Sequence, residues 1–409
     1  MARATPNATV KPLEESWRVV VDDVLGSLGA PRTEDVSRLG PKVAELSRAY
    51  NAGEAGVGKA VPLDARVAFS FARDVPKGAA AVRELVATRA LRLHGSGGPA
   101  LRLLDVGAGI GAMTWGIARA LAAAGEQGRI EATLVDADAR ALAAAKKIAD
   151  AASRHRDETL EGVELTVTTA ERTVRAGTRG AWPSGFDLVV AGQVLSELDA
   201  ELGPDARAAA HAELLLDLLN GSVKDDGALV VVEPALKGRT RHLHAVREIV
   251  LARGATVFAP CLHARACPAL ANEDDWCHED LAVDLPGWLV PLARASGLRW
   301  QGLTFSYLVL RRDGLRLVDS IAPSPSRFRV VSDLLRTKGK TEVFGCTDEG
   351  RRVRLRRLER DERRSPTGWD ELARGDVVRV EGEVDETGRL APDVTVDVDA
   401  LREPRPVRT

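Results

Sequence analysis

The 409-residue chain is poor in cysteine, in aromatic residues and in long apolar segments: it has four cysteines, and aromatic residues make up 4% of it. No apolar run reaches the roughly 20 residues of a transmembrane helix, and the N-terminal segment lacks the continuous apolar stretch of a signal peptide. The richness in alanine, arginine and glycine is typical of a GC-rich bacterial genome. We therefore expect a bacterial, cytoplasmic protein without a membrane partner, in which clustered cysteines hold metal rather than form disulfides.

Charge is nearly balanced overall but not locally. The formal net charge is -2, whereas residues 336–364 contain eleven Lys or Arg and six Asp or Glu. A local basic excess in a near-neutral chain indicates a surface for a polyanion. The length itself predicts two or three domains with sizeable cores.

Helical and strand patterns alternate through the middle of the chain. Apolar residues at helical spacing predict helices within residues 17–28 and 63–93. Apolar strands and helices then alternate, and a last strand returns at 304–311; the expected strands are 101–106, 130–135, 163–167, 186–191 and 228–232, and the expected helices are 113–124, 139–152 and 206–219. Strands that alternate with helices form parallel sheets covered on both faces, so the prediction is a Rossmann-like α/β fold.

Short strands of a different kind follow a Pro-Ser linker at 323–326. The expected strands are 328–331, 341–346, 353–358, 377–384 and 394–398, which predicts a small β-barrel of the oligonucleotide-binding kind. The predicted division is a helical region (1–95), a sheet domain with a cysteine insert at about 255–285 (96–322), and a basic β-rich unit (323–409).

A glycine-rich turn follows the first strand. Asp105 precedes Gly107, Gly109 and Gly111, so the backbone turns tightly between a strand and a helix and lets a ligand approach. The spacing resembles that of class I S-adenosylmethionine-dependent methyltransferases; the alternative is a tight turn of a dehydrogenase or of an empty fold.

The resemblance to methyltransferases also predicts a role for the residue at the end of the second strand. In that fold an acidic residue there binds the ribose hydroxyls, which makes Asp136 the candidate, with Asp138 in reserve; a solvated strand end or helix cap is the alternative. By the same analogy, the loop near Ala170 and Glu171 contacts the adenine.

The segment after the fourth strand is where such folds carry the residues that face the methyl group. Its polar candidates are Gln193, Ser196 and Glu197, and Ser196 and Glu197 equally suit a helix cap. The Asn/Asp-Pro-Pro-Tyr/Phe motif of base amino-group methyltransferases is absent. These three residues are therefore weak candidates for a catalytic role.

The four cysteines are confined to one late part of the chain, at Cys261, Cys267, Cys277 and Cys346. Four thiolates can hold a zinc ion or an iron–sulfur cluster. Zinc sites usually pair ligands two to four residues apart, whereas the first three cysteines are separated by five and nine residues; His263 or His278 can still complete a Cys3His zinc site. Unligated buried cysteines are the third alternative.

A resemblance to one family joins these features. The segments Ala259-Pro260-Cys261 to Trp276-Cys277-His278, Leu195-Ser196-Glu197-Leu198 and Phe71 to Ala80 are similar to the ribosomal small-subunit Rsm22 family, also called methyltransferase-like protein seventeen in mitochondria. The resemblance covers roughly residues 60 to 350, although Val75-Pro76-Lys77-Gly78 departs from the family's Arg-x-Pro-Ala-Thr helix start. It implies a 4Fe-4S cluster held by the four cysteines and the small ribosomal subunit as partner.

The basic C-terminal unit fits a polyanionic partner as well. Phosphate contact is the natural use of its cations, and the alternative is a solvated, ion-paired surface. Because Phe344 and Trp369 are the few aromatics nearby, ribosomal or duplex RNA backbone fits better than a stacked single strand, and no DNA partner is expected. The predicted function is a small-subunit methyltransferase-like protein; the alternatives are a small-molecule methyltransferase with structural zinc and a non-catalytic RNA-binding assembly factor.

Overall fold

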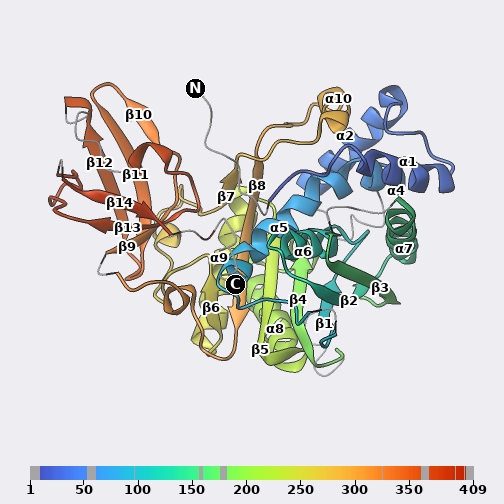
Figure 1. Cartoon of the computed structure of the whole chain (residues 1–409), viewed down its shortest axis with the longest axis horizontal. Coiled ribbons are helices and arrows are strands. Elements are labelled where there is room, and N and C mark those ends of the chain that lie inside the picture. The colour runs from blue at the N-terminus through green and yellow to red at the C-terminus, as the bar shows by residue number, and fades with distance from the viewer. Residues whose placement is uncertain are drawn as a thin grey trace.

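The computed structural model describes residues 10–52, 61–95, 97–155, 160–175, 182–324, 326–360, 368–391, 393–399 and 401. An α/β body and a separate β-barrel lie side by side (Figure 1). Among the described residues, none of the helices is both long and apolar enough to span a membrane.

One twisted sheet forms the centre of the α/β body, in the order β3-β2-β1-β4-β5-β8-β6. Its strands are β1 (Leu101–Val106), β2 (Gly128–Asp136), β3 (Val163–Glu171), β4 (Phe186–Gly192), β5 (Val223–Glu233), β6 (Thr256–Ala259) and β8 (Leu303–Arg311). A short strand, β7 (Glu279–Leu281), pairs with the N-terminal end of β8. The strands β1 to β5 pair in parallel, whereas β8 runs antiparallel between β5 and β6. This order with one reversed strand is the class I methyltransferase sheet, so the predicted fold class is confirmed.

Alternating side chains bury both faces of the sheet. Leu101 and Leu103 of β1 join the core on one face, while Leu104 and Val106 join the core on the other, as the two-residue period of a strand requires. The first face is covered by α5 (Phe71–Ala87) and α6 (Ala112–Ala123), and the second by α8 (Pro204–Gly221) and α9 (Lys237–Ala252).

Helices α5 and α6 approach each other closely because glycines lie between them. A Cβ on Gly78 would stand 2.6 Å from the Met113 carbonyl oxygen, and one on Gly116 would stand 2.1 Å from the Val75 carbonyl oxygen. The helix α5 follows a short α4 (Leu63–Ala65) and a π-helical turn (Arg66–Ser70). The Pro-Lys-Gly segment, likened in the sequence to a helix start, therefore lies inside a helix that begins earlier.

The N-terminal helices pack against the edge of this body. Helix α1 (Trp17–Ser27) packs on α7 (Ala139–His155), and α2 (Val36–Ala52) packs on α10 (Val290–Ala295). Trp17 makes an edge contact with Trp115 at 4.9 Å between ring centroids. The helical N-terminal region is thus joined to the sheet domain through a shared apolar core.

The C-terminal barrel has a recognisable pairing order. It comprises β9 (Arg327–Val330), β10 (Leu335–Thr337), β11 (Lys340–Thr347), β12 (Arg352–Leu358), β13 (Val377–Glu381) and β14 (Thr395–Val398). Strand β9 pairs with β11 and β13, β11 with β12, and β13 with β14, while a parallel bridge joins Arg356 of β12 to Arg389. The order β12-β11-β9-β13-β14, with the Arg356–Arg389 bridge at one end, resembles the strand order of an oligonucleotide-binding barrel, and β10 is an added hairpin strand.

A buried charge network joins the barrel to the α/β body. Arg329 of β9 pairs with Glu84 of α5 at 2.7 Å, and Arg83 pairs with Glu279 at 3.1 Å. The Tyr307 hydroxyl donates a hydrogen bond to Glu84 at 2.7 Å. Burial opposes the charge on both arginines, but the neighbouring carboxylates outweigh it and raise the pKa of each. We name this set, Arg83, Glu84, Glu279, Tyr307 and Arg329, the interdomain network.

Candidate cofactor pocket and cysteine site

A cavity of about 1020 Å³ opens at the carboxyl ends of the parallel strands. It lies beyond the ends of the paired strands β1 and β4, where the strand order reverses, the usual ligand position of open α/β folds. Its lining includes the predicted Asp105, Gly107, Gly109 and Asp136, together with Gln193, Ser196 and Glu197. The structure therefore brings most of the predicted cofactor and acceptor residues together; Gly111 and Glu171 do not line the cavity.

The glycine turn needs its glycines. Gly107, Gly109 and Gly111 have φ values of 66°, 54° and 85°, a region that residues with a Cβ rarely adopt. A Cβ on Gly107 would also stand 2.3 Å from a methyl carbon of Val194. Gly111 serves as the N-cap of α6, behind the cavity wall.

Two acidic residues, Asp136 at the end of β2 and Asp138 just after it, line the cavity but have different surroundings. Asp136 lines the cavity and accepts hydrogen bonds from the backbone N–H of Gly109 and of Asp138, both at 2.8 Å. Asp138 is buried between Arg66 at 3.3 Å and Arg140 at 3.1 Å. Burial acts to raise the Asp138 pKa, but hydrogen bonds from Arg140 outweigh it and lower the pKa. Asp138 is thus committed to two arginines, which favours Asp136 over Asp138 for the predicted role.

Asp105 is a buried acid at the base of the cavity. Its Oδ2 accepts a hydrogen bond from the Thr114 hydroxyl at 2.8 Å, and within the described part of the chain its Oδ1 lacks a partner. Burial raises the pKa of Asp105 to about 7. Glu171 is different: it is exposed at the end of β3, beside Asp136 in the sheet register.

The segment after β4 is held from two sides. Gln193 has a φ of 61°, unusual for a residue with a side chain, and its N–H donates to the Val232 carbonyl at 2.6 Å. The Leu195 N–H donates to Glu233 at 2.9 Å, and burial raises the pKa of Glu233 to about 7. Arg207 of α8 donates to the carbonyls of Leu195, Ser196 and Leu198 at 2.9–3.1 Å. The three acceptor-side candidates therefore stand on a fixed backbone.

Residues of the N-terminal helices complete the cavity, and the sequence patterns did not identify them. These are Tyr50, Arg66, Arg73 and Lys77, joined by Arg239 of α9. Lys77 is buried and pairs with Asp74 at 2.7 Å; burial lowers its pKa. The one available signal was the segment Phe71 to Ala80, which the family resemblance had singled out without a role for its cations.

The four cysteines line a second cavity, of about 50 Å³. Cys261, Cys267 and Cys277 lie in the loop between β6 and β7, and Cys346 lies on β11 of the barrel. Each thiol is half-buried and free of disulfides. Residues far apart in sequence and on separate units thus converge on one site.

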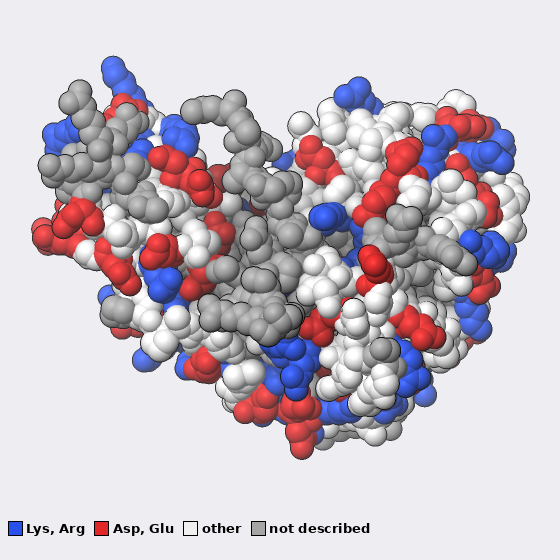
Figure 2. Space-filling view, in the orientation of Figure 1, with Lys and Arg blue, Asp and Glu red and all other residues white. Residues whose placement is uncertain are grey.

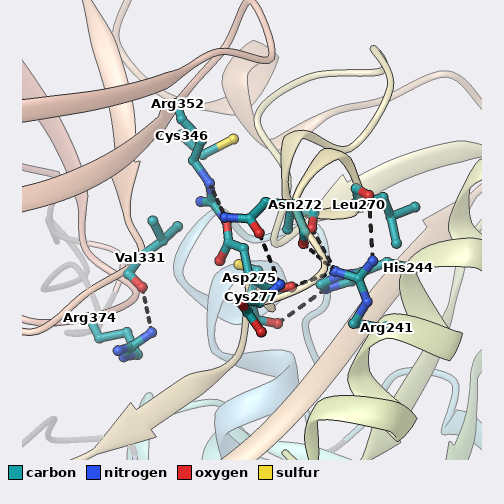
Figure 3. A network of polar contacts seen from close by, with 12 residues as sticks. Arg241, His244, Leu270, Asn272, Asp275, Cys277, Val331, Cys346, Arg352 and Arg374 are labelled. Atoms are coloured by element: carbon teal, nitrogen blue, oxygen red, sulfur yellow. Dashed lines mark hydrogen bonds and ion pairs between the residues drawn. The ribbon is translucent and has the colours of Figure 1, made fainter.

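One face of α9 holds the cysteine loop in position. Arg241, His244 and Arg247 are three residues apart, which aligns them along a helix. Arg241 donates to the carbonyls of Ala269, Asn272 and Asp275, and His244 contacts the Cys277 carbonyl at 3.2 Å (Figure 3). Arg247 donates through Nε to the Cys261 sulfur at 3.2 Å.

The barrel closes the site from the other side. The Cys346 sulfur lies 3.4 Å from His263 Nε2. Arg352 pairs with Asp275 of the cysteine loop at 2.8 Å (Figure 3). Burial raises the pKa of Cys277 and of Cys346 to about 12. Because metal ligands are thiolates, a bound cation is needed to deprotonate these thiols, and Arg247 and Arg352 offset part of the resulting negative charge.

The arrangement of the possible metal ligands bears on what this cavity can hold. Across the described residues, no group of three or more His, Cys, Asp or Glu side chains is arranged to hold a metal ion directly. Four sulfurs around one cavity, with two arginines beside them, still have the donor chemistry of an iron–sulfur site.

The basic residues of the barrel are largely ion-paired. Lys340 pairs with Glu342 at 2.7 Å and Arg357 with Asp370 at 3.2 Å, and Figure 2 shows acidic and basic side chains side by side on the barrel. Arg363 and Arg364 of the predicted basic set lie outside the described residues. Trp369 is fully buried in the barrel core, whereas Phe344 is exposed.

Solved structures with some similarity are methyltransferases. Mitomycin 7-O-methyltransferase is 13% identical, aligns over 66% of this chain and 66% of its own, and has a TM-score of 0.29. A methyltransferase from Agrobacterium tumefaciens (14% identity, 60% and 63% covered, TM-score 0.32) and TrmN from Thermus thermophilus (16%, 59% and 52%, 0.29) are similar to the same degree. Scores this low add no weight to the argument.

The comparison with protein families is more informative. No significant match exists among curated proteins. The family model described as mitochondrial small ribosomal subunit Rsm22 matches residues 75–360, more than half of the chain and close to the span of the resemblance seen in the sequence. The chain belongs to the Rsm22 family.

Proposed function

We propose that this chain is an S-adenosylmethionine-binding, iron–sulfur-containing methyltransferase-like protein that acts on the small ribosomal subunit, in rRNA methylation or in subunit assembly and translation. The observation that carries the proposal is the convergence of all four cysteines on one cavity beside a class I methyltransferase sheet. The family description, which names the mitochondrial small ribosomal subunit, supports the partner. It lends no support to the predicted bacterial cytoplasmic location.

The large cavity suits S-adenosylmethionine. The turn at Gly107 and Gly109 leaves room for the ligand, and Asp136 faces the cavity with a carboxylate able to accept ribose hydroxyls. When bound, the cofactor supplies a methyl group on a sulfonium. The protein's contribution to any transfer is to orient two substrates and exclude water, and Gln193, Ser196 and Glu197 are the residues on the acceptor side.

The cysteine cavity suits a 4Fe-4S cluster better than zinc. A zinc ion binds its sulfurs at about 2.3 Å, which draws all four together around a single point. Zinc sites also tend to pair ligands two to four residues apart, whereas the first three cysteines here are separated by five and nine residues. We therefore assign Cys261, Cys267, Cys277 and Cys346 as cluster ligands.

A non-catalytic assembly factor is the second candidate. It is favoured by the acceptor-side segment, which lacks the Asn/Asp-Pro-Pro-Tyr/Phe motif and whose Ser196 hydroxyl donates internally to the Gln193 carbonyl at 3.3 Å. Methyl transfer to small-subunit RNA from labelled cofactor distinguishes it from an enzyme. We retain the division 1–95, 96–322 and 323–409 as the proposed domains.

The test is an anaerobic purification of the full chain. We expect a brown protein with broad visible absorbance, about four iron and four sulfide per chain, saturable S-adenosylmethionine binding by calorimetry, and association with small ribosomal subunits. A colourless preparation with one zinc per chain would refute the cluster, and an absence of cofactor binding would refute the pocket assignment.

A further inference from the structure

The outward face of β11 and β12 carries an exposed aromatic ring. Along β11, the inward residues Val343 and Gly345 belong to the barrel interior, so Phe344 between them points outward. Phe344 is 38% exposed, whereas Val343 is fully buried. The other face of β11 already fills the barrel core. The exposed ring of Phe344 therefore does not contribute to the packing of the barrel.

Cations surround this ring. In the register of the two strands, Phe344 lies opposite Arg354, Glu342 opposite Arg356, and Cys346 opposite Arg352. The outward face therefore combines Lys340 and three arginines with one carboxylate, Glu342. Lys340 and Arg354 both pair with that carboxylate, at 2.7 Å and 3.8 Å, and the Arg354 side chain is 48% exposed. Arg352 pairs with Asp275, so four cations face two carboxylates. The face keeps a positive excess next to the phenyl ring.

An exposed ring flanked by cations suits a nucleic-acid strand as its ligand. A flat ring offers a stacking surface to a nucleobase, and flanking cations contact the phosphates on either side of it. In oligonucleotide-binding barrels the second and third strands form the ligand face, and β11 and β12 occupy those positions in the pairing order. A double-stranded backbone would use the cations but leave the ring without a function.

We propose that this face binds single-stranded RNA, with one base stacked on Phe344 and the adjacent phosphates on Arg354 and Arg356. The inference rests on the proposed small-subunit function and names the form of RNA that the barrel contacts. It replaces the sequence-based expectation of duplex backbone, because Phe344 is displayed rather than buried like Trp369.

The same strand pair leads into the cysteine site. Cys346 is two residues from Phe344 on the same face, and Arg352 opposite it pairs with Asp275 of the cysteine loop. RNA bound on the face therefore lies next to the cysteine cavity. Because the Arg352–Asp275 pair ties β12 to the cysteine loop, we expect RNA binding on this face to depend on that contact.

The experiment measures fluorescence anisotropy of a labelled oligouridine of about 12 nucleotides and of a matched duplex, with anaerobically purified full-length protein. Phe344→Ala should weaken single-strand binding roughly tenfold, and Phe344→Trp should retain it. Arg354→Ala combined with Arg356→Ala should reduce the slope of log K against log salt by about 1.4, the loss of two phosphate contacts on a single strand. Val398→Ala is the matched control, since Val398 of β14 is also 38% exposed.

Each outcome has a distinct meaning. Wild-type protein that binds small subunits and single strands, with Phe344→Ala weakened and Val398→Ala unchanged, supports the proposal. Equal single-strand binding by Phe344→Ala and wild type, or a preference for the duplex, overturns it and leaves the proposed function standing. Loss of subunit binding in Phe344→Ala without loss of RNA binding assigns the face to a ribosomal protein and overturns it too. A wild-type protein that binds neither subunits nor RNA refutes the proposed function itself.

Discussion

The two cavities of this protein are built in opposite ways. The cofactor pocket, about 1020 Å³, lies at one edge of a single sheet and is lined mainly by strand ends and the turns after them. The cysteine cavity, about 50 Å³, lies between two units and takes its fourth thiol from the barrel, 69 residues beyond Cys277. The first is made by the sheet and the N-terminal helices packed on it, whereas the second exists only while the barrel stays docked.

The difference predicts which site is the more fragile. Disturbing the contact between the units should open the cysteine site and leave cofactor binding intact, because β1, β2 and β4 do not depend on the barrel. Disturbing the pocket should have the reverse effect. The two sites are therefore separable by mutation, even though α5 contributes both Lys77 to the pocket and Glu84 to the interdomain network.

The largest effect should follow from Cys346→Ser. This change removes the cluster ligand that we propose in the barrel while three loop thiols remain, so we expect loss of most of the bound iron and faster proteolysis between the two units. Iron and sulfide analysis with limited proteolysis measures both. Affinity for S-adenosylmethionine should stay within about twofold of wild type, which calorimetry checks.

The control for that change is Thr347→Ser, a nearby conservative replacement on the same strand that leaves the four thiols in place. Full iron content in Cys346→Ser would contradict the assignment of the fourth ligand. A parallel loss of cofactor affinity would contradict the independence of the two cavities.

The next effect should come from Arg329→Met. Removing this buried cation leaves Glu84 without its 2.7 Å partner, and breaking a buried pair in this way costs about 3–5 kcal/mol. Urea denaturation of the full chain measures the free energy of unfolding, and iron content reports whether the cysteine site opens as well.

Arg312→Met is the matched control, since Arg312 pairs with an exposed Asp225 and its loss should cost less than about 0.5 kcal/mol. Equal costs for the two arginines would show that the interdomain network does not hold the units together.

The same contrast explains what the sequence revealed. The strands β1 to β5 and the glycine turn were predicted within a few residues, because buried parallel strands and glycine turns leave local patterns. The convergence of the four cysteines was implied by a family resemblance and by their count, but no local pattern indicates that β11 docks on the cysteine loop. The cations of α5 were missed for the same reason: Lys77 belongs to the pocket only because α5 packs across the sheet.

On the pocket side, Asp136→Ala should weaken S-adenosylmethionine binding by about 1–3 kcal/mol, the cost of a lost hydrogen bond to a charged group. Because Asp136 also accepts the backbone N–H of Gly109, part of the loss reflects a looser turn. Asp136→Asn keeps the oxygen acceptor for that N–H and should lose less. Calorimetry on both variants measures the difference, and affinities equal to wild type would remove Asp136 from the site.

The last effect, which is the smallest when counted per pH unit, concerns the pH dependence of stability, and it isolates one buried acid of the pocket. Burial raises the pKa of Asp105 to about 7, above its unfolded value of about 3.9, so between these values the folded state binds more protons than the unfolded state. Stability from this group must then fall as pH rises through that window, by at most about 1.4 kcal/mol per pH unit, and level off above it.

Asp105→Asn keeps an oxygen for the Thr114 hydroxyl but cannot ionise, so it should lack this component. The free energy of unfolding of the variant minus that of wild type, measured without cofactor from about pH 5 to 8, should therefore increase with pH in the upper part of this window and level off above it. Subtraction removes the contributions of Glu233 and the other titrating groups, because they are common to both proteins. A difference independent of pH would mean that Asp105 is ionised in the folded protein and that the base of the pocket is open to water.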